Sequence, residues 1–365
     1  MRKLISDFFV NNPRIEVVGT ARNGKDALKK IQSLKPDVVT MDVEMPELNG
    51  LDALKEIMNV CPVPVVMLSS TTNKNAENTM IAMEYGAVDF VAKPSGTISL
   101  DLHKIQDELI HKVEEATKVP ISKLKKPIHL KALQREASSI KKTMNNSLTK
   151  SVNDQNNLHS TKFVSTVKKD WSRSSKKIVL IGTSTGGPRA LQEVITKIPK
   201  NIEAPILIVQ HMPAGFTKSL ANRLNQLSGI TVKEAEHGDI LHNGFAYIAP
   251  GGYHMKLRKV GTSFGIVLDE TEPPRSGHRP SVDVMFEDVS QYDDFDKIAV
   301  IMTGMGYDGA AGLKQLKKTG NVMAIAESAD TCIVYGMPKA AVETQLVDEV
   351  ADVDDIAQSI MKYML

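Results

Sequence analysis

The sequence predicts an α/β protein with two doubly wound parallel-sheet domains joined by a disordered linker. Short apolar runs of strand length alternate with helical patterns over residues 1–116, and the same alternation resumes at residue 178. The stretch between them lacks any sustained periodicity. Alternating strands and helices build parallel sheets that are covered by helices on both faces. We therefore expect domains at residues 1–118 and 177–365 and a linker at residues 119–176.

The elements of the first domain follow from apolar periodicity, with turn residues at their ends. The chain opens with a pattern typical of a helix. Strands are expected where valine-rich apolar runs occur, at residues 15–19, 37–42, 63–69 and 88–92. Helices are expected at residues 26–34, 50–60, 76–85 and 100–116.

The expected linker is basic and polar. Between Pro120 and Lys177 it holds fourteen Lys or Arg residues and three Asp or Glu residues, although the whole chain has a formal net charge of only +2. Lys, Ser and Asn predominate, a composition typical of a solvated tether. Aromatic residues interleaved with the basic ones, and a nucleic-acid motif, are missing from it. We therefore expect no nucleic-acid partner.

Composition places the chain among ordinary globular proteins. It has 365 residues, of which 42% are hydrophobic and 24% charged. No apolar run approaches the ~20 residues that span a bilayer, and the opening residues lack the pattern of a signal peptide. Cys61 and Cys332 fall in different predicted domains and make no disulfide framework. These features predict a cytoplasmic protein that does not insert into membranes.

Ser184, His211 and Asp308 carry the chemistry of the second domain, because each follows an apolar run and precedes a helical pattern. The carboxyl ends of parallel strands share one edge of a sheet, where sites form. A serine, a histidine and an aspartate at that edge are the parts of a nucleophilic hydrolase. Each residue alone is more often structural, so the inference depends on all three together. The strand-like runs are residues 177–183, 205–210 and 298–303, with further strands expected at 244–249, 264–268 and 322–326.

Residues 182–186 read Gly-Thr-Ser-Thr-Gly, which fits the G-x-S-x-G turn that exposes a serine hydroxyl between a strand and a helix. Unpaired N–H groups at the start of that helix can stabilise an oxyanion. The order of the three residues is Ser, His, Asp, whereas the α/β-hydrolases run Ser, Asp, His. The α/β-hydrolase fold is therefore not expected.

The second domain resembles the catalytic domain of the chemotaxis protein-glutamate methylesterases, which is Rossmann-like. The similarity lies in six stretches in order, at residues 181–188, 210–217, 249–255, 279–284, 303–309 and 331–338. The resemblance implies that Ser184 is the nucleophile, His211 the base and Asp308 its aspartate. It also implies that the backbone N–H of Met305 helps to form the oxyanion hole. Residue 327 is glutamate where the family is expected to have glutamine, which bears on local substrate contacts.

The resemblance also implies what the enzyme acts on. The substrates would be γ-glutamyl methyl esters on the cytoplasmic helices of methyl-accepting chemoreceptors, with receptor glutamines as targets of deamidation. The catalytic reaction would need no metal or organic cofactor.

The first domain resembles a response-regulator receiver, a flavodoxin-like fold with sheet order 2-1-3-4-5. Asp42 ends a strand within Val39-Thr-Met-Asp-Val-Glu-Met-Pro46, Ser69 ends the next strand, and Lys93 precedes a proline. The resemblance implies that Asp42 accepts a phosphoryl group from a chemotaxis histidine kinase. It makes Ser69 and Lys93 the switch residues.

The receiver pattern departs from the family at its start. The first strand and the acidic pair that holds Mg²⁺ have no match, so Asp42 is the only matched carboxylate of the magnesium site. Residues 15–19 would then lack their central neighbour. We expect that Met1 is an internal methionine of a longer product. If the chain does begin there, we expect weak phosphorylation and a destabilised receiver.

Two other functions remained open from the sequence. A receptor-docking module without regulated catalysis would bind receptor arrays independently of Ser184. A DNA-binding response regulator is disfavoured, because residues 178–365 contain no helix-turn-helix or winged-helix pattern.

Overall fold

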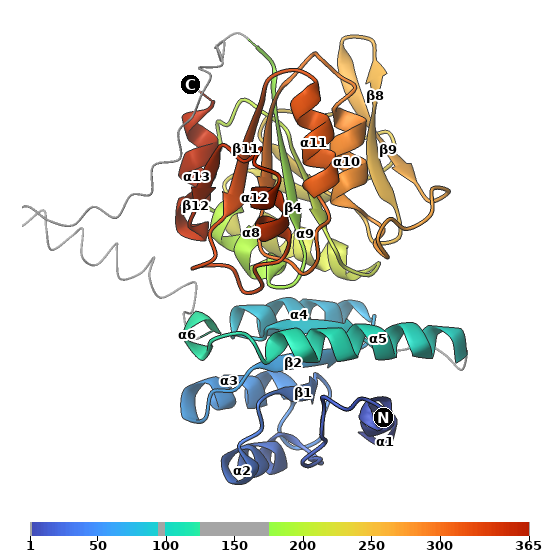
Figure 1. Ribbon diagram of the computed structural model, residues 1–365, viewed down its shortest axis with the longest axis vertical. Helices are drawn as coiled ribbons and strands as arrows, with labels where there is room; N and C mark the ends of the chain where they lie inside the picture. The colour runs from blue at the N-terminus through green and yellow to red at the C-terminus, as the bar shows by residue number, and fades with distance from the viewer. Residues whose placement is uncertain (1, 94–98, 125–174, 365) are drawn as a thin grey trace, which may run out of the picture. The chain divides into compact units, whose positions relative to one another are not determined.

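The computed structural model describes residues 2–93, 99–124 and 175–364, and it confirms the α/β class in both halves of the chain (Figure 1). Most of the expected linker, residues 125–174, lies outside the described residues. Its opening residues lie within the described part, where α6 (Ile121–Leu124) follows α5 (Ser99–Ala116). Val119 and Leu124 are buried there. No helix among the described residues has the length and apolar character that crossing a membrane requires.

The N-terminal half contains a three-stranded parallel sheet in the order β1-β2-β3. The central strand β2 is buried at every position, which explains why its sequence is a continuous apolar run. Asn23 and Asn49 cap two of the helices by accepting the backbone N–H groups of Asp26 and Asp52. The elements are α1 (Arg2–Phe9), α2 (Gly24–Leu34), β1 (Val39–Asp42), α3 (Gly50–Val60), β2 (Val65–Ser69), α4 (Asn73–Glu84), β3 (Asp89–Ala92) and α5 (Ser99–Ala116).

The strand expected at residues 15–19 is wrong, because that segment joins no sheet among the described residues. Val17 and Val18 are 42% and 50% exposed, unlike the buried valines of β2. A strand needs a neighbour to satisfy its backbone N–H and C=O groups. In the described sheet β1 is an edge strand, and no strand lies between it and residues 15–19. Apolar composition without a pairing partner therefore leaves this segment irregular.

The C-terminal half contains a seven-stranded parallel sheet in the order β12-β11-β10-β4-β5-β7-β6. Its strands are β4 (Lys177–Thr183), β5 (Ile206–Gln210), β6 (Thr231–Glu234), β7 (Phe245–Ile248), β10 (Asp296–Ile301), β11 (Val322–Glu327) and β12 (Glu349–Ala351). Its helices are α8 (Gly187–Ile195), α9 (Phe216–Leu227), α10 (Val282–Val289), α11 (Ala310–Lys318), α12 (Met337–Glu343) and α13 (Val353–Lys362).

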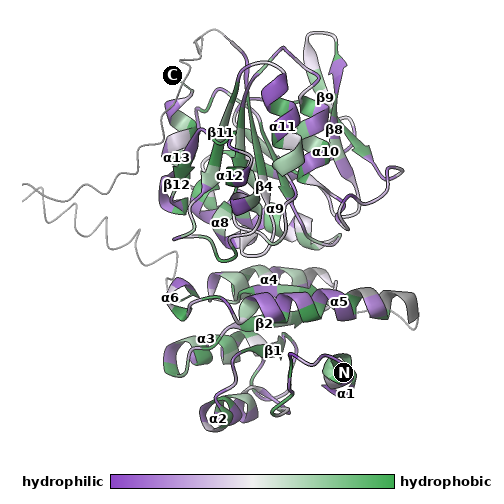
Figure 2. Cartoon of the chain, in the orientation of Figure 1, coloured by the Kyte–Doolittle hydropathy of each residue, from purple (hydrophilic) through white to green (hydrophobic). Residues whose placement is uncertain are grey.

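Central strand β4 supports a hydrophobic layer on each face of this sheet. Val179 and Ile181 belong to the same core as buried residues of α8, α9 and α13. Ile178 and Leu180 belong to a second core with α10, α11 and α12. Figure 2 shows the middle of β4, residues 178–181, as apolar, while the surrounding helices alternate between apolar and polar residues. Side chains alternate between the faces of a strand, so a strand that is covered on both faces has a nearly continuous apolar run.

The strand expected at residues 264–268 is observed, but it lies outside the seven-stranded parallel sheet. It is part of β9 (Ser263–Asp269), which pairs antiparallel with β8 (His254–Val260) in a separate two-stranded sheet. Only two residues connect them, and Gly261 has a φ of 60°. Such a tight hairpin joins antiparallel strands, whereas a parallel pair needs a long crossover.

Candidate functional site

The three residues expected to act together follow neighbouring strands. Ser184 comes directly after β4, and His211 comes directly after β5. Asp308 lies between β10 and α11, and the sheet order places β4 between β10 and β5. The backbone N–H of Ser184 donates to Thr303 O at 3.0 Å, and that of His211 donates to Thr183 O at 3.1 Å. The carboxyl edge of this sheet therefore holds all three residues.

His211 and Asp308 form a buried pair. Nε2 of His211 lies 2.8 Å from Oδ2 of Asp308, and the two side chains are only 5% and 3% exposed. An ionised carboxylate only accepts hydrogen bonds, so Nε2 carries the proton in the neutral ring. Nδ1 of His211 is then the basic nitrogen, and it is buried without a hydrogen-bond partner in the described structure. That unused nitrogen can accept a proton from a hydroxyl.

The start of α10 holds the carboxylate of Asp308. Oδ1 accepts Ser281 Oγ at 2.9 Å and the N–H of Asp283 at 2.9 Å, and Oδ2 accepts the N–H of Val282 at 2.7 Å. Burial raises the pKa of Asp308, but the hydrogen bond and the electrostatic attraction of His211, together with the N–H groups of Val282 and Asp283, lower it more. The pKa of Asp308 is consequently well below its ordinary value, and the carboxylate stays ionised.

Asp283 adds a second buried carboxylate that the sequence did not single out. Its Oδ1 accepts the backbone N–H groups of Gly309 at 2.9 Å and Gly312 at 2.6 Å, on either side of the first residues of α11. Burial, together with the charge of Asp308, raises the pKa of Asp283 to about 6. Asp283 thus fixes the turn that carries Asp308, because both partners lie within four residues of it.

A tight turn places Ser184 at the end of β4. Gly186 has a φ of 78°, a conformation that residues with a side chain rarely adopt. A Cβ at Gly187 would lie 2.0 Å from Oε1 of Gln210, so only glycine fits there. Among the described residues no hydrogen bond involves Ser184 Oγ, and none joins it to His211. The structure brings the two residues to one sheet edge, and in the described part of the chain the hydroxyl of Ser184 makes no hydrogen bond.

Gln210 ties the backbones of the serine and the histidine together, and the sequence did not reveal its role. Its Nε2 donates to Ser184 O at 2.9 Å and to His211 O at 3.2 Å. Its Oε1 accepts Thr183 Oγ1 at 2.6 Å. The side chain is 2% exposed, and a buried polar group needs such partners. A polar residue at the end of an otherwise apolar strand was the one available signal.

Two backbone N–H groups near Ser184 are suited to an oxyanion. Within the part of the chain that the structure describes, the N–H groups of Thr185 and Met305 donate to no other residue. Gly304, which precedes Met305, is held by hydrogen bonds to Val334 and from Met337. The serine-hydrolase elbow likewise uses the N–H of the residue after the nucleophile. Thr185 is therefore a second candidate donor beside Met305.

His278 stacks on the histidine of the site. Its ring centroid lies 3.8 Å from that of His211, with an angle of 9° between the planes. Burial, together with the neighbouring His211 ring, lowers the pKa of His278 to about 4. His278 is therefore neutral near pH 7, and it covers one face of the imidazole without adding a positive charge.

We expect replacement of His278 by phenylalanine to reduce the fall in the free energy of unfolding between pH 7 and pH 4. The folded-state pKa of about 4 lies below the ordinary histidine pKa of about 6.5, so the unfolded chain binds the proton first as the pH falls. This contribution to stability is complete above pH 6.5 and is lost as the pH falls toward 4, by up to about 3 kcal/mol. Denaturant unfolding of both proteins between pH 7 and 4 measures it. Parallel curves for the two proteins would contradict this assignment.

In the N-terminal half, two of the three expected residues meet. Lys93 Nζ lies 2.6 Å from Oδ1 of Asp42, which also accepts the N–H of Glu44 at 2.9 Å. Ser69 ends β2 and is fully buried, with Thr79 Oγ1 donating to its Oγ at 2.8 Å. No group of three His, Cys, Asp or Glu side chains suited to a metal occurs among the described residues. A site with one carboxylate that already contacts a lysine does not fit Mg²⁺, which needs several oxygen ligands.

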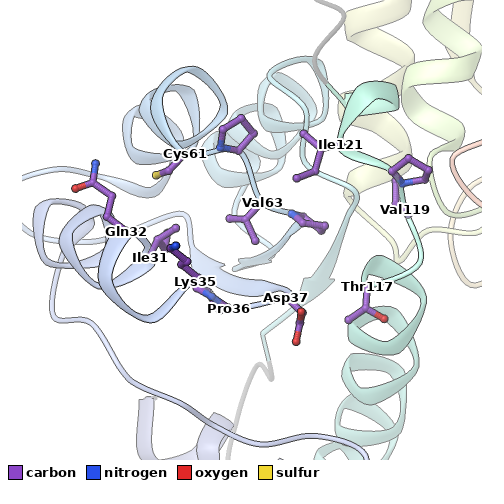
Figure 3. A pocket seen from close by; sticks show the side chains of 13 residues that line it. Ile31, Gln32, Lys35, Pro36, Asp37, Cys61, Val63, Thr117, Val119 and Ile121 are labelled. Atoms are coloured by element: carbon purple, nitrogen blue, oxygen red, sulfur yellow. The ribbon is translucent and has the colours of Figure 1, made fainter.

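A cavity of about 600 Å³ lies in the N-terminal half, away from these residues (Figure 3). Ile31, Lys35, Asp37, Cys61 and Val63 line it, together with residues that follow α5. Its lining includes none of the residues expected to act in either half. The residues expected to act therefore lie at the sheet edges and not in this cavity.

Comparison with known proteins gives matches over nearly the whole chain. The CheB methylesterase family matches residues 179–360, and the response regulator receiver domain family matches residues 1–103. A protein-glutamate methylesterase/protein-glutamine glutaminase of Geobacillus kaustophilus is 52% identical over 99% of this chain and 95% of its own length. The Bacillus subtilis protein of the same description is 49% identical over 99% and 94%. The methylesterase catalytic domain of Thermotoga maritima CheB is 44% identical, with a TM-score of 0.49, over 52% of this chain and 98% of that one.

Proposed function

The chain belongs to the protein-glutamate methylesterase/protein-glutamine glutaminase family. We propose that Ser184, His211 and Asp308 hydrolyse glutamyl methyl esters through an acyl-enzyme. The observation that carries this assignment is the buried His211–Asp308 pair at 2.8 Å, with Nδ1 of His211 unpartnered beside the strand end that bears Ser184. We divide the chain accordingly into a receiver domain at 1–118, a linker at 119–176 and a catalytic domain at 177–365.

The reaction divides into two displacements. Ser184 Oγ attacks the carbonyl carbon of the glutamyl methyl ester while Nδ1 of His211 takes the hydroxyl proton. The resulting oxyanion accepts hydrogen bonds from the N–H groups of Met305 and Thr185. Collapse breaks the bond to methoxide, which takes the proton from His211 and leaves as methanol. Water then attacks the acyl-enzyme with the same proton transfers, releasing the glutamate carboxylate and restoring Ser184.

The same residues can deamidate glutamine. The amide carbonyl takes the place of the ester carbonyl, and His211 delivers its proton to the leaving nitrogen, which departs as ammonia. Hydrolysis of the identical acyl-enzyme leaves glutamate. The substrates we propose are the cytoplasmic helices of methyl-accepting chemoreceptors. No step requires a metal or an organic cofactor.

Asp42 is the phosphoacceptor that we propose for the receiver, with a chemotaxis histidine kinase as donor. Lys93 Nζ lies 2.6 Å from the carboxylate of Asp42, and Ser69 lies buried at the end of the adjacent strand β2. The carboxylates found here do not fit the family's magnesium site, so phosphorylation in this chain is expected to be weak. Treating the protein with acetyl phosphate and Mg²⁺, with an Asp42→Asn variant alongside, measures it by intact mass. Rapid, complete phosphorylation of Asp42 would contradict this expectation.

The experiment that tests the proposed function measures methanol released from methylated chemoreceptor membranes. One portion of the protein is first treated with a fluorophosphonate, which labels activated serines. We expect untreated protein to release methanol and treated protein to release none, with the label located on Ser184 by peptide mass. Methanol release that persists after complete labelling would contradict the assignment. Absence of release from the untreated protein would favour a receptor-docking role instead.

A further inference from the structure

Glu327, the last residue of β11, is a buried carboxyl that the mechanism above does not use. It is 1% exposed, so it does not contact a substrate from the surface, although the expected departure from glutamine had raised that question. Its Oε2 accepts the backbone N–H of Thr303 at 2.7 Å, and its Oε1 accepts Thr331 Oγ1 at 3.0 Å. Each carboxyl oxygen therefore has a defined partner.

Thr303 connects the segments that form the site. Its carbonyl accepts the N–H of Ser184 at 3.0 Å, and its hydroxyl donates to Thr185 O at 3.0 Å. The same hydroxyl accepts the N–H of Val334 at 3.0 Å. Residues 304 and 305 follow Thr303 directly in the chain, so a shift of Thr303 moves both the nucleophile turn and the peptide of Met305.

The carboxyl of Glu327, at the end of β11, holds the backbone of Thr303 in place. Burial raises the pKa of Glu327 to about 7, although the hydrogen bonds from Thr303 and Thr331 oppose the rise. A neutral carboxyl keeps one carbonyl oxygen for the Thr303 N–H and can donate its proton to the hydroxyl of Thr331. A glutamine amide offers the same acceptor and donor. An apolar side chain would leave the Thr303 N–H buried without a partner.

We propose that Glu327 is a positioning residue, which holds the Thr303 backbone and thereby sets the Ser184 turn relative to the Met305 N–H. This inference rests on the proposed function and names a residue that supports the same site. Removing one oxyanion donor typically lowers kcat by about 10²-fold to 10³-fold. Because Glu327 acts through Thr303, we expect the loss on removing it to be smaller, about tenfold to 100-fold.

The test compares Glu327→Met, which removes both hydrogen bonds, with Glu327→Gln, which preserves them. We expect Glu327→Met to lower kcat for methanol release and the rate of fluorophosphonate labelling by the same factor, with KM within about threefold. Glu327→Gln is expected to stay within about threefold of the unmodified protein. If Glu327→Met does not fold, Glu327→Asn replaces it, because its amide is one methylene too short to reach Thr303.

Asp288 provides the matched control. It is also a carboxylate that accepts a backbone N–H, that of Leu257 at 2.7 Å, and burial raises its pKa to about 6. It lies in α10 and contacts none of Ser184, His211 or Asp308 in the described structure. Asp288→Leu therefore reports the general cost of removing such a group. We expect it to lower the unfolding midpoint as Glu327→Met does while leaving kcat within about twofold.

The outcomes separate the inference from the proposed function. Equal activity of Glu327→Met and Asp288→Leu would overturn the positioning role, as would a loss in Glu327→Gln as large as that in Glu327→Met. Labelling of Ser184 needs no receptor substrate. If the unmodified protein is labelled but releases no methanol, the proposed function fails while the labelling rates still decide the role of Glu327.

Discussion

Replacing Ser184 with alanine is expected to lower kcat for methanol release by about 10⁶-fold. The change removes the atom that forms the acyl bond, while the backbone N–H of residue 184 still donates to Thr303 O, as it does at 3.0 Å in the present structure. Binding of the receptor substrate should therefore change little. Methanol release over hours, with a binding measurement on methylated receptor membranes, distinguishes the loss of chemistry from a loss of binding.

Ser290→Ala is the control for this experiment. Ser290 is also a buried serine of the C-terminal half, and its hydroxyl donates to Glu287 O at 2.7 Å at the end of α10. We expect its kcat to stay within about twofold of the unmodified protein. Substantial release by the Ser184→Ala variant would show that another group is the nucleophile.

Replacing Asp308 with asparagine is expected to lower kcat by about 10⁴-fold, with KM little changed. The carboxylate accepts four hydrogen bonds, from His211, Ser281 and the N–H groups of Val282 and Asp283. An amide NH₂ must face at least one of these donors in either orientation. Where it faces His211, Nε2 becomes the acceptor and the proton moves to Nδ1, which can then no longer take the proton of Ser184.

The variant should also be less stable. Two donors that face each other in a buried site leave both without a partner, at a cost of about 1–3 kcal/mol. Asp288→Asn is the control, because its remaining carbonyl can still accept the one backbone N–H, that of Leu257. Activity and unfolding free energy are measured on both variants. An Asp308→Asn enzyme within tenfold of the unmodified kcat would contradict the role given to this carboxylate.

Local patterns were enough to predict most helices and buried strands. The helix expected at residues 50–60 is observed as α3 with the same ends, because Asn49 caps it and a polar and apolar period runs through it. The strand expected at 15–19 failed, since apolar composition does not supply a pairing partner. The strand at 264–268 was found, but its antiparallel pairing depends on the two-residue turn at Gly261.

The residues of the site divide in the same way. The positions of Ser184, His211 and Asp308 after apolar runs were visible in the sequence, because a strand end is a local property of the chain. Gln210, His278 and Asp283 were not recognised as parts of the site, and Glu327 was noted only for its expected difference from the family, since their roles depend on partners distant in the sequence. Glu327 accepts a hydrogen bond from Thr303, which follows the neighbouring strand β10, and His278 stacks on a ring 67 positions earlier in the chain.

Residue patterns along the chain were sufficient for the class of fold, for the strand ends that bear the reactive residues, and for the family to which they belong. The neighbours of each strand, the nitrogen of His211 that has no partner, and the donors that hold Asp308 became known from the folded chain. Apolar periodicity records how each segment meets the core, whereas hydrogen bonds and ring stacking form between segments. Those contacts exist only after β10, β4 and β5 have come together and α10 has packed against them.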